Sequence, residues 1–346
     1  MTDQPLLKAL SGQAVEPPPC WFMRQAGRFL PEYRKTRQQA GSFLDLCYNP
    51  ELASEVTLQP IHRFDMDAAI IFADILLIPQ ALGMKLWFEQ GEGPRLAPPL
   101  EEFGDGAGMA ALPDMPHMAI LEPVYETVKK TRHALAPEKS VIGFAGAPWT
   151  VATYMLHGRG SKDPASLREL YYQNPEFIET LLEKISAASI TYLSQQIEHG
   201  ADAIQLFDSW AGGLPESLLH RLCLEPSQKI AAALKQKHPQ TPIILFPRGV
   251  GASLADYAEI PEFDAIGIDS SASWEWVKKQ ISPKKTVQGG LDPLLVVKGG
   301  EEMIRATRKL KRVFADSPYI FNLGHGFVPQ TPPENVARLI QVIREP

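Results

Sequence analysis

The stretch PCWFMRQAGR, residues 19–28, joins a short apolar run to two arginines. The run CWFM is typical of a buried strand, and Arg24 and Arg28 follow it on either side of Gly27, which tolerates unusual backbone conformations. The planar guanidinium group of arginine binds carboxylate or phosphate through two parallel hydrogen bonds. Most charged runs are solvated surfaces, but this one directly follows a buried run and so favours a loop that binds an anion.

Positive charge continues beyond this stretch, because Arg34, Lys35 and Arg37 face only one acid, Glu32. The whole chain is nevertheless acidic: 34 Lys and Arg residues stand against 40 Asp and Glu residues, a formal net charge of −6. An acidic chain is a poor candidate for general nucleic-acid binding, which needs an extended basic face. The local cluster therefore indicates a localised anionic ligand, although Arg34 and Arg37 fit a surface role equally well.

Cysteine usage and apolar segments favour a protein of a reducing compartment without a membrane anchor. The three cysteines, Cys20, Cys47 and Cys223, form no Cys-x-x-Cys pair, which argues against a disulfide framework and a zinc ribbon. The first residues lack the basic segment and long apolar run of a secretory signal. No stretch reaches about 18 uninterrupted apolar residues, the length that spans a bilayer.

Short apolar runs rich in β-branched and aromatic residues recur along the chain and predict strands. Because these runs are continuous, they fit strands that are buried on both faces of a parallel sheet. The predicted strands cover residues 20–23, 68–73, 141–145, 203–207, 242–246, 265–268, 286–289 and 319–323. Helical patterns separate them; the pattern at 175–200 begins with Pro175 and stops at Gly200.

Eight strands with helical crossovers match an α/β fold of the (β/α)8 or TIM-barrel type, with the active site at the C-terminal ends of the strands. A doubly wound parallel sheet is the alternative, which the strand count alone does not exclude. Residues 84–120 carry many Gly and Pro residues and predict an excursion or hairpin rather than a linker. We expect one domain over residues 1–346.

A polar residue or a glycine follows each predicted strand. These residues are Arg24, Asp74, Gly146, Asp208 with Ser209, Arg248, Asp269, Gly289 with Gly290, and Gly324 with His325. In a parallel barrel all carboxyl ends of the strands open onto one face. Residues that are distant in the sequence are therefore expected to converge there.

Asp74 lies inside the otherwise apolar stretch IIFADILLIP. A buried carboxylate without a partner costs several kcal/mol, about 2–7 for a neutral polar group and more for a charge, so Asp74 must be paired, hydrogen-bonded or protonated. Two interpretations follow from its position. Asp74 either caps a helix that starts at Ile75 or points into the mouth of the barrel, where it accepts N–H donors from a ligand.

Four further side chains lie at or after strand ends. Tyr154 falls in the helix that follows GFAGAP, where a tyrosine is more often a core residue. Asp208 and Ser209 end the run LFDSWAGG, and either fits a turn or a ligand contact. His325 stands between two glycines after the last strand, a position that fits a site as well as the usual structural or surface role.

Several common sites are not indicated by the sequence. No His-Glu-x-x-His, Cys/His cluster or EF-hand pattern predicts a metal. No G-x-G-x-x-G or Walker A sequence follows a strand, so no dinucleotide or ATP site is predicted. The glycines at 289–290 and 324–326 could instead form a barrel phosphate site, which is the main alternative reading of the residues themselves.

Six stretches resemble the uroporphyrinogen decarboxylase family. They are PCWFMRQAGR (19–28), FADILLIPQALGM (72–84), GFAGAPWTVATYM (143–155), LFDSWAG (206–212), QGGLDP (288–293) and NLGHG (322–326). The matches span nearly the whole chain in order, and the first is highly specific. His157 and Phe29 depart from the commoner residues of the family's two signature motifs, at positions that carry no expected contact.

This resemblance implies a single (β/α)8 barrel that removes CO₂ from the four acetate side chains of uroporphyrinogen III and gives coproporphyrinogen III. It also implies a reaction without metal or organic cofactor, a cytoplasmic location and a homodimer. Asp74, Arg24 and Arg28 are the implied catalytic residues. The implied substrate contacts are Arg24, Gln25, Ala26, Gly27, Arg28, Arg37, Asp74, Tyr154, Ser209 and His325.

Three other functions remain possible at this point. A zinc-dependent methyltransferase of the same superfamily needs Cys and His ligands at strand ends, which this chain lacks. A carrier of anionic tetrapyrroles would bind without releasing CO₂. A sugar-phosphate barrel would prefer small phosphate esters to porphyrinogens.

Overall fold

Seven strands of the chain form one curled parallel sheet. A computed structural model describes residues 3–89, 92–103, 112–113, 116–160 and 165–345. The sheet contains β1 (Ala68–Ile70), β4 (Ser140–Gly146), β5 (Ala203–Asp208), β6 (Ile243–Pro247), β7 (Ala265–Ile268), β8 (Thr286–Gly289) and β9 (Tyr319–Ile320), in that spatial order. Each of the seven overlaps a strand predicted from the sequence. The order never reverses, unlike that of a doubly wound sheet.

The sheet strands are buried along their length, which is why they are continuous apolar runs. All seven residues of β4, for example, are buried. Hydrogen-bonded glutamines run through this apolar interior: Gln288 donates from Nε2 to Gln205 Oε1 at 3.0 Å and accepts from Trp21 Nε1 at 2.9 Å. Trp21 and strands β5 and β8 are thereby joined, and each of these polar atoms has a partner.

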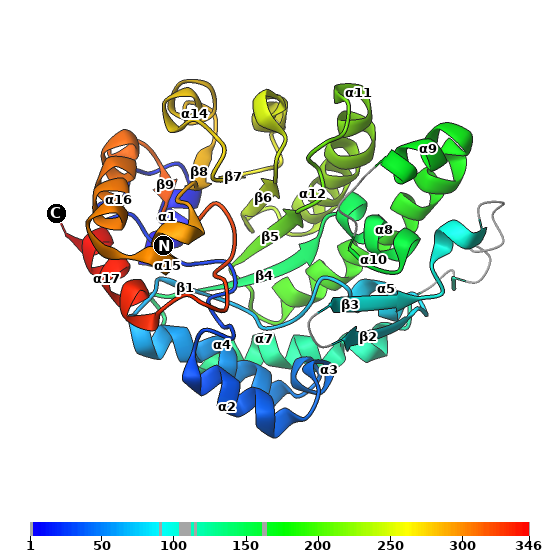
Figure 1. Cartoon of the computed structure of the whole chain (residues 1–346), viewed down its shortest axis with the longest axis horizontal. Coiled ribbons are helices and arrows are strands. Elements are labelled where there is room, and N and C mark those ends of the chain that lie inside the picture. The colour runs from blue at the N-terminus through cyan, green and yellow to red at the C-terminus, as the bar shows by residue number, and fades with distance from the viewer. Residues whose placement is uncertain (1–2, 90–91, 104–111, 114–115, 161–164, 346) are drawn as a thin grey trace.

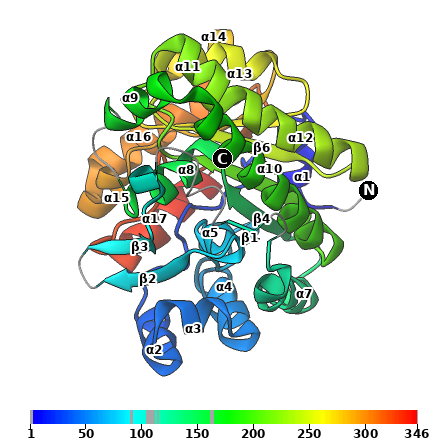
Figure 2. The same cartoon turned by 90° about the vertical axis from the view of Figure 1, so that its right-hand side faces the viewer.

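Helices surround the sheet (Figures 1 and 2). The longer ones are α2 (Pro31–Ala40), α4 (Pro50–Phe64), α7 (Glu122–Ala134), α8 (Pro148–His157), α9 (Ala165–Gln173), α10 (Pro175–Glu198), α12 (Glu225–Lys237), α16 (Gly300–Phe314) and α17 (Pro333–Arg344). The shorter ones are α1 (Pro5–Leu10), α3 (Phe43–Cys47), α5 (Leu77–Ala81), α11 (Glu216–Leu219), α13 (Leu254–Glu259), α14 (Trp274–Gln280) and α15 (Pro293–Lys298). Single turns form 3₁₀ helices at Leu100–Phe103, Met118–Leu121 and Gly251–Ser253 and a π-helix at His220–Leu224.

The predicted first strand, 20–23, is wrong as a strand, because it forms a single bridge from Cys20 to Phe321. Its first residues do lie between β9 and β1: Phe321 N donates to Pro19 O at 2.8 Å, and Asp67 N donates to Cys20 O at 2.9 Å. Further along, the N–H groups of Phe22 and Met23 bond to the side chains of Gln25 and Asn322. Side-chain acceptors thus replace a strand neighbour and let the chain turn towards Arg24.

Helix α10 forms where its sequence pattern predicts it. Asn174 caps the helix by accepting from Phe177 N at 3.2 Å, and Pro175 occupies the first turn, where its missing N–H costs nothing. The helix ends before Gly200, whose φ of 112° is unfavourable for other residues.

The Gly- and Pro-rich region 84–120 contains the predicted hairpin. Strands β2 (Lys85–Glu89) and β3 (Gly93–Ala97) pair antiparallel, and residues 90–91, 104–111 and 114–115 of this region lie outside the described residues. Helix α8 packs against β3. The hairpin, α8 and α9 lie at the right-hand end of Figure 1, which faces the viewer in Figure 2.

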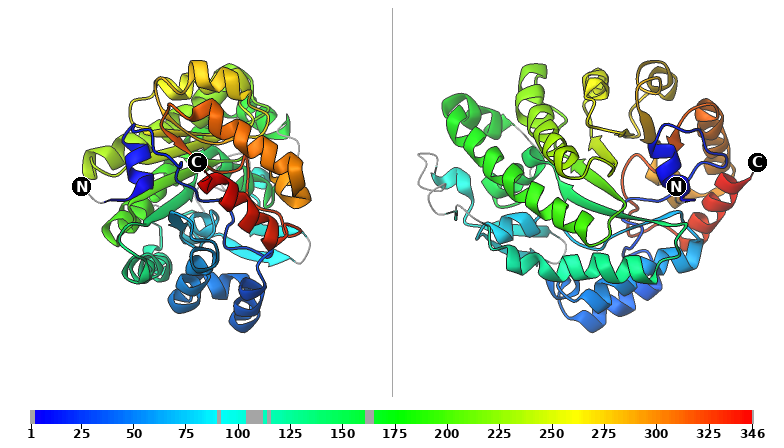
Figure 3. Two further views of the ribbon diagram at one scale, coloured as in Figure 1. Left: turned by 90° about the vertical axis from the view of Figure 1, so that its left-hand side faces the viewer. Right: turned by 180° about the vertical axis from the view of Figure 1, so that it is seen from behind.

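The first and last helices lie on one side of the molecule, as the left view of Figure 3 shows. Helix α1 contacts β9, and α17 contacts α4 and α16. Asp67 connects this side to the sheet, because its Oδ2 accepts from both Cys20 N and Arg344 at 2.7 Å. None of the described helices is long and apolar enough to cross a membrane.

Candidate active site

The loop that carries Arg24 packs directly against the loop after β9. Phe327 N donates to Met23 O at 3.0 Å, and Met23 N donates to Asn322 Oδ1 at 3.2 Å. A Cβ on Gly326 would lie 2.6 Å from Arg24 Cδ, so only glycine leaves room for the arginine stem. Contacts from the last strand of the sheet therefore set the direction of the Arg24 side chain.

Arg24, and not Gly27, adopts the unusual backbone conformation of this loop. Its φ is 59°, a region that non-glycine residues enter at a cost of about 1–2 kcal/mol. Gly27 is needed for another reason: a Cβ there would lie 2.8 Å from Arg24 O. The strained conformation sits in the predicted anion-binding loop, where backbone strain is concentrated in many proteins.

Gln25 turns away from the solvent and holds this loop on the sheet. Its side chain is fully buried; Oε1 accepts from Phe22 N and Nε2 donates to Ala68 O, both at 3.0 Å. The family resemblance implies that Gln25 contacts the substrate, but both polar atoms of its side chain are already hydrogen-bonded to backbone groups. Ala26 and Gly27 are half-buried beside it.

Asp74 lies in the turn after β1 and is half-buried. Its Oδ1 accepts from Leu76 N at 2.8 Å, while no described residue forms a hydrogen bond or ion pair with its Oδ2. Burial raises the pKa of Asp74 from 3.8 to about 6, although the Leu76 N–H and the charge of Arg24 oppose that rise. The alternative that Asp74 caps a helix from Ile75 is wrong, because α5 starts at Leu77 with Leu76 as its N-cap.

Tyr154, on α8, lies close to both Asp74 and Arg24. Burial raises the pKa of the Tyr154 hydroxyl. The negative charge of Asp74 raises this pKa as well, and the positive charge of Arg24 lowers it. Its ring packs edge-on against Trp210, with 6.1 Å between the ring centroids. Surrounding protein groups likewise lower the pKa of Arg24 by desolvation, although part of the residue stays exposed. The structure thus brings together three residues from distant parts of the sequence.

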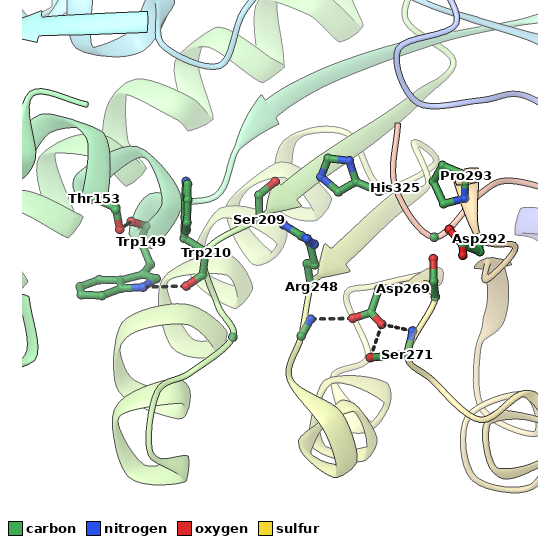
Figure 4. A pocket seen from close by; sticks show the side chains of 14 residues that line it. Trp149, Thr153, Ser209, Trp210, Arg248, Asp269, Ser271, Asp292, Pro293 and His325 are labelled. Carbon is green, nitrogen blue, oxygen red and sulfur yellow. Dashed lines mark hydrogen bonds between the residues drawn. The ribbon is translucent and has the colours of Figure 1, made fainter. Parts of the chain in front are cut away.

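A cavity of about 500 Å³ opens beside these residues, over the carboxyl ends of β5 to β9 (Figure 4). It contains Ser209 and His325, two of the predicted contacts. The other lining residues are Trp149, Thr153, Trp210, Gly212, Arg248, Gly249, Asp269, Ser270, Ser271, Asp292, Pro293 and Gly324. The expected convergence of strand-end residues is confirmed in part: Ser209, Arg248, Asp269, Gly324 and His325 share this lining, whereas the other predicted strand-end residues are not in it.

His325 is held in its neutral form within this cavity. Burial, helped by the charges of Arg24 and Arg248 and opposed by that of Asp269, lowers its pKa to about 4. Its ring lies edge-on to Phe246, 6.4 Å between centroids. At neutral pH the imidazole therefore offers one N–H donor and one acceptor to a ligand.

Asp208 orders the turn that presents Ser209. It is fully buried; its Oδ1 accepts from Thr150 Oγ1 at 2.6 Å, and the same Thr150 oxygen accepts from Trp210 N at 3.0 Å. Burial raises the pKa of Asp208 to about 6. These hydrogen bonds give Asp208 a structural role in the turn, while the half-buried Ser209 lines the cavity, and its ligand contact stays a prediction.

Arg28 and Arg37 do not line the cavity. Arg28 is exposed, and its backbone oxygen accepts from Arg34 Nη1 at 2.8 Å. Arg37 is half-buried and donates from Nη1 to Gly41 O at 2.7 Å. Arg24, Asp74 and Tyr154 are also absent from the lining of this cavity. Arg24 packs against Gly326, and Tyr154 packs against the lining residue Trp210.

No metal site was predicted from the sequence. Among the described residues, one group of three side chains nevertheless has the spacing that could hold a metal ion. Glu216, His220 and Asp256 approach one another closely enough, but none of them lines the cavity. His220 Nε2 already lies 2.9 Å from Asp256 Oδ2. We therefore interpret the group as a surface ion pair.

A family model described as uroporphyrinogen decarboxylase (URO-D) matches residues 1–346. Proteins named uroporphyrinogen decarboxylase are 50% identical in Paracoccus denitrificans (99% of this chain, 100% of that protein) and 49% identical in Rhodospirillum rubrum (100% and 98%). A methyltransferase from Methanosarcina mazei superimposes with a TM-score of 0.76 over 99% of this chain and 98% of that one, at 21% identity. That likeness concerns the fold alone.

Proposed function

The chain belongs to the uroporphyrinogen decarboxylase family, and we propose that the residues around Asp74 hold uroporphyrinogen while CO₂ leaves its acetate side chains. The chain decarboxylates uroporphyrinogen in tetrapyrrole biosynthesis. In the proposed reaction all four acetates of uroporphyrinogen III become methyl groups, and the product is coproporphyrinogen III. A polyanionic substrate accounts for a cluster of arginines in an acidic protein.

One observation carries the proposed mechanism: Asp74 is a half-buried carboxylate beside Arg24 and Tyr154 whose Oδ2 has no partner among the described residues. The pyrrole N–H groups of the substrate would supply the missing donors. Charge-assisted hydrogen bonds of this kind contribute about 1.5–3 kcal/mol each. Asp74 would thereby fix the centre of the macrocycle over the mouth of the sheet.

The chemistry requires an acceptor for the electrons of the breaking carbon–carbon bond. A proton added to the α-carbon of a pyrrole makes that ring a cation, and the acetate then releases CO₂ as its bonding electrons enter the ring. The exocyclic carbon takes up one proton to become a methyl group, and the ring loses the proton gained first. The Asp74 carboxylate would stabilise the cationic ring electrostatically, usually the largest contribution to catalysis. Arg24 and Arg28 would hold the carboxylates of the substrate.

This role predicts a pH dependence with a definite direction. Since the ionised form of Asp74 is required and its pKa is about 6, kcat/KM should rise as the pH increases through about 6. His325, with a pKa of about 4, stays neutral throughout and adds no inflection there. The pH profile of the wild-type enzyme under anaerobic conditions measures this.

Asp208 has a similar pKa and provides the control for that assignment. The inflection should persist in the Asp208→Asn variant, because Asp208 is buried away from the substrate. Its disappearance in that variant would assign the titration to Asp208 and remove the support for an ionised Asp74.

The test of the whole proposal is anaerobic incubation of the purified chain with uroporphyrinogen III, followed by oxidation and a count of the carboxylates on the product. We expect stepwise loss of the four acetate carboxylates. Binding without any loss would identify a carrier, and preferential binding of small phosphate esters would identify a sugar-phosphate barrel. Either result would contradict the proposed decarboxylase mechanism.

We further propose that residues 1–346 act as one (β/α)8 domain in which residues 19–23 occupy the eighth strand position. The hydrogen bonds of this segment to Phe321, directly after β9, and to Asp67, directly before β1, support a closed ring, because these are the two end strands of the sheet order. We also propose that the chain forms a homodimer and that it acts in the cytoplasm. The molar mass in solution and cell fractionation test these two.

A further inference from the structure

Arg248 is a cation in the cavity that no sequence motif assigned to the site. It follows β6 directly, and its N–H donates to Asp208 O at 3.0 Å, which fixes the backbone at the mouth of the cavity. Figure 4 shows its side chain directed towards Ser209 and His325. Among the described residues, none forms a hydrogen bond or ion pair with its guanidinium group, and the side chain is exposed within the cavity.

The acids near Arg248 are already occupied by other donors. Asp269 accepts from Gly249 N at 2.6 Å with Oδ2 and from Ser271 N at 2.7 Å with Oδ1. Burial would raise the pKa of Asp269, but these hydrogen bonds and the charge of Arg248 hold it below its usual value. Asp292, the other acid of the lining, accepts from Leu294 N at 2.9 Å as the N-cap of α15. The acids thus order the backbone and leave Arg248 available to a ligand.

Arg248 and Arg24 stand on opposite sides of the mouth. From the segment at Cys20, β6 is the fourth neighbour in one direction (β1, β4, β5, β6) and also in the other (β9, β8, β7, β6). Both guanidinium groups nevertheless lie near His325, because the positive charge of each lowers the pKa of its imidazole. The charge of Arg248 also lowers the pKa of Arg24. Within the part of the chain that the structure describes, neither guanidinium group forms a hydrogen bond or ion pair with another residue. Arg248 lines the cavity, and Arg24 packs against Gly326, next to the lining residue His325.

We propose that Arg248 binds a carboxylate on the periphery of the substrate, opposite the carboxylates held by Arg24. A macrocycle centred on Asp74 carries carboxylates around its whole rim, so cations on one side alone would leave the far rim unbound. A guanidinium group free to make two parallel hydrogen bonds suits such a carboxylate. The inference rests on the proposed function, since it takes the same site and the same substrate.

The experiment compares Arg248→Gln, Arg248→Lys and a matched control, Arg312→Gln, which removes the same charge from an exposed position on α16. Arg248→Gln should raise KM for uroporphyrinogen by about tenfold or more, the loss expected for one charge-assisted hydrogen-bond pair, with a smaller effect on kcat. Arg248→Lys should recover part of the loss because it keeps the charge without the planar fork. The control should behave as the wild type.

A KM in Arg248→Gln equal to that of the wild type would overturn the proposal while leaving the decarboxylase activity intact. Equal losses in the glutamine and lysine variants, with a fall in melting temperature, would also overturn it, because they would indicate a structural role. If the wild-type chain released no CO₂, the proposed function would fail instead. In that case, fluorescence titration with the oxidised octacarboxylate porphyrin still tests the carboxylate contact of Arg248. Weaker binding by Arg248→Gln than by the wild type supports that contact, and equal binding contradicts it.

Discussion

Asp74→Asn is expected to lower kcat by about two to three orders of magnitude, the loss typical when one electrostatic stabiliser of a transition state is removed. Asparagine has nearly the same shape and keeps an oxygen that can accept from Leu76 N, so the turn after β1 should survive. It lacks the negative charge that stabilises the cationic pyrrole. Steady-state kinetics under anaerobic conditions measure the effect, and KM should change less than kcat.

The same variant should be more stable than the wild type at neutral pH. The pKa of Asp74 rises from 3.8 to about 6 in the folded chain, so its contribution to stability is complete below pH 3.8 and is lost as the pH increases through 6. Above that range the ionised, buried carboxylate costs on the order of 2–3 kcal/mol, which asparagine avoids. Urea unfolding should therefore show a gain for Asp74→Asn at pH 7 that disappears near pH 4.

Glu301→Gln, which neutralises an exposed acid on α16, is the control for the loss of one negative charge. It should leave both kcat and the unfolding free energy unchanged. A fully active Asp74→Asn enzyme would reduce Asp74 to a structural residue of the turn. The mechanism proposed here would then lose its central group.

Arg24→Gln is expected to lower kcat/KM by about a hundredfold, because it removes at least one charge-assisted hydrogen bond to the substrate and the cation nearest Asp74. Both parameters should change: KM rises as a carboxylate loses its partner, and kcat falls as the macrocycle is held less firmly over Asp74. The pH profile gives a second readout. Without the charge of Arg24, the pKa of Asp74 increases, and the inflection in kcat/KM moves to higher pH.

Lys35→Gln provides the matched comparison, since Lys35 is an exposed cation on α2, a few positions after Arg24. It should have wild-type kinetics if the effect of Arg24 is local. Equal losses in the two variants would indicate that the general positive charge of this region attracts the substrate. An inflection that stays at the same pH in Arg24→Gln would separate Arg24 from Asp74.

The strands could be predicted from the sequence because a strand buried on both faces has to be apolar throughout. Seven of the eight predicted strands form, and residues 84–120 contain the predicted hairpin. The segment 20–23 has the same apolar pattern, yet only Cys20 forms a bridge. The difference lies in Gln25 and Asn322, whose side chains accept the N–H groups of Phe22 and Met23. Apolar periodicity carries no information about such acceptors.

The candidate site could be predicted where a motif or a strand end pointed to it, as for Arg24, Asp74 and His325. Orientation could not be predicted: adjacent residues Arg24 and Gln25 point in opposite directions, one into the mouth and one into the core. Arg248 follows a strand in the sequence but has no distinctive neighbours. Its significance depends on the absence of a partner among the described residues and on its position across from Arg24, both of which are properties of the folded chain.

The contacts of the first loop have a consequence for synthesis of the chain. Arg24 is translated early, but the groups that orient it, Gln288, Asn322 and Phe327, are translated near the end. A nascent chain on the ribosome therefore carries the arginine long before it can bind a porphyrinogen. The proposed site can assemble only when almost the whole chain has emerged, so a ribosome that stalls before residue 322 is expected to release a product without it.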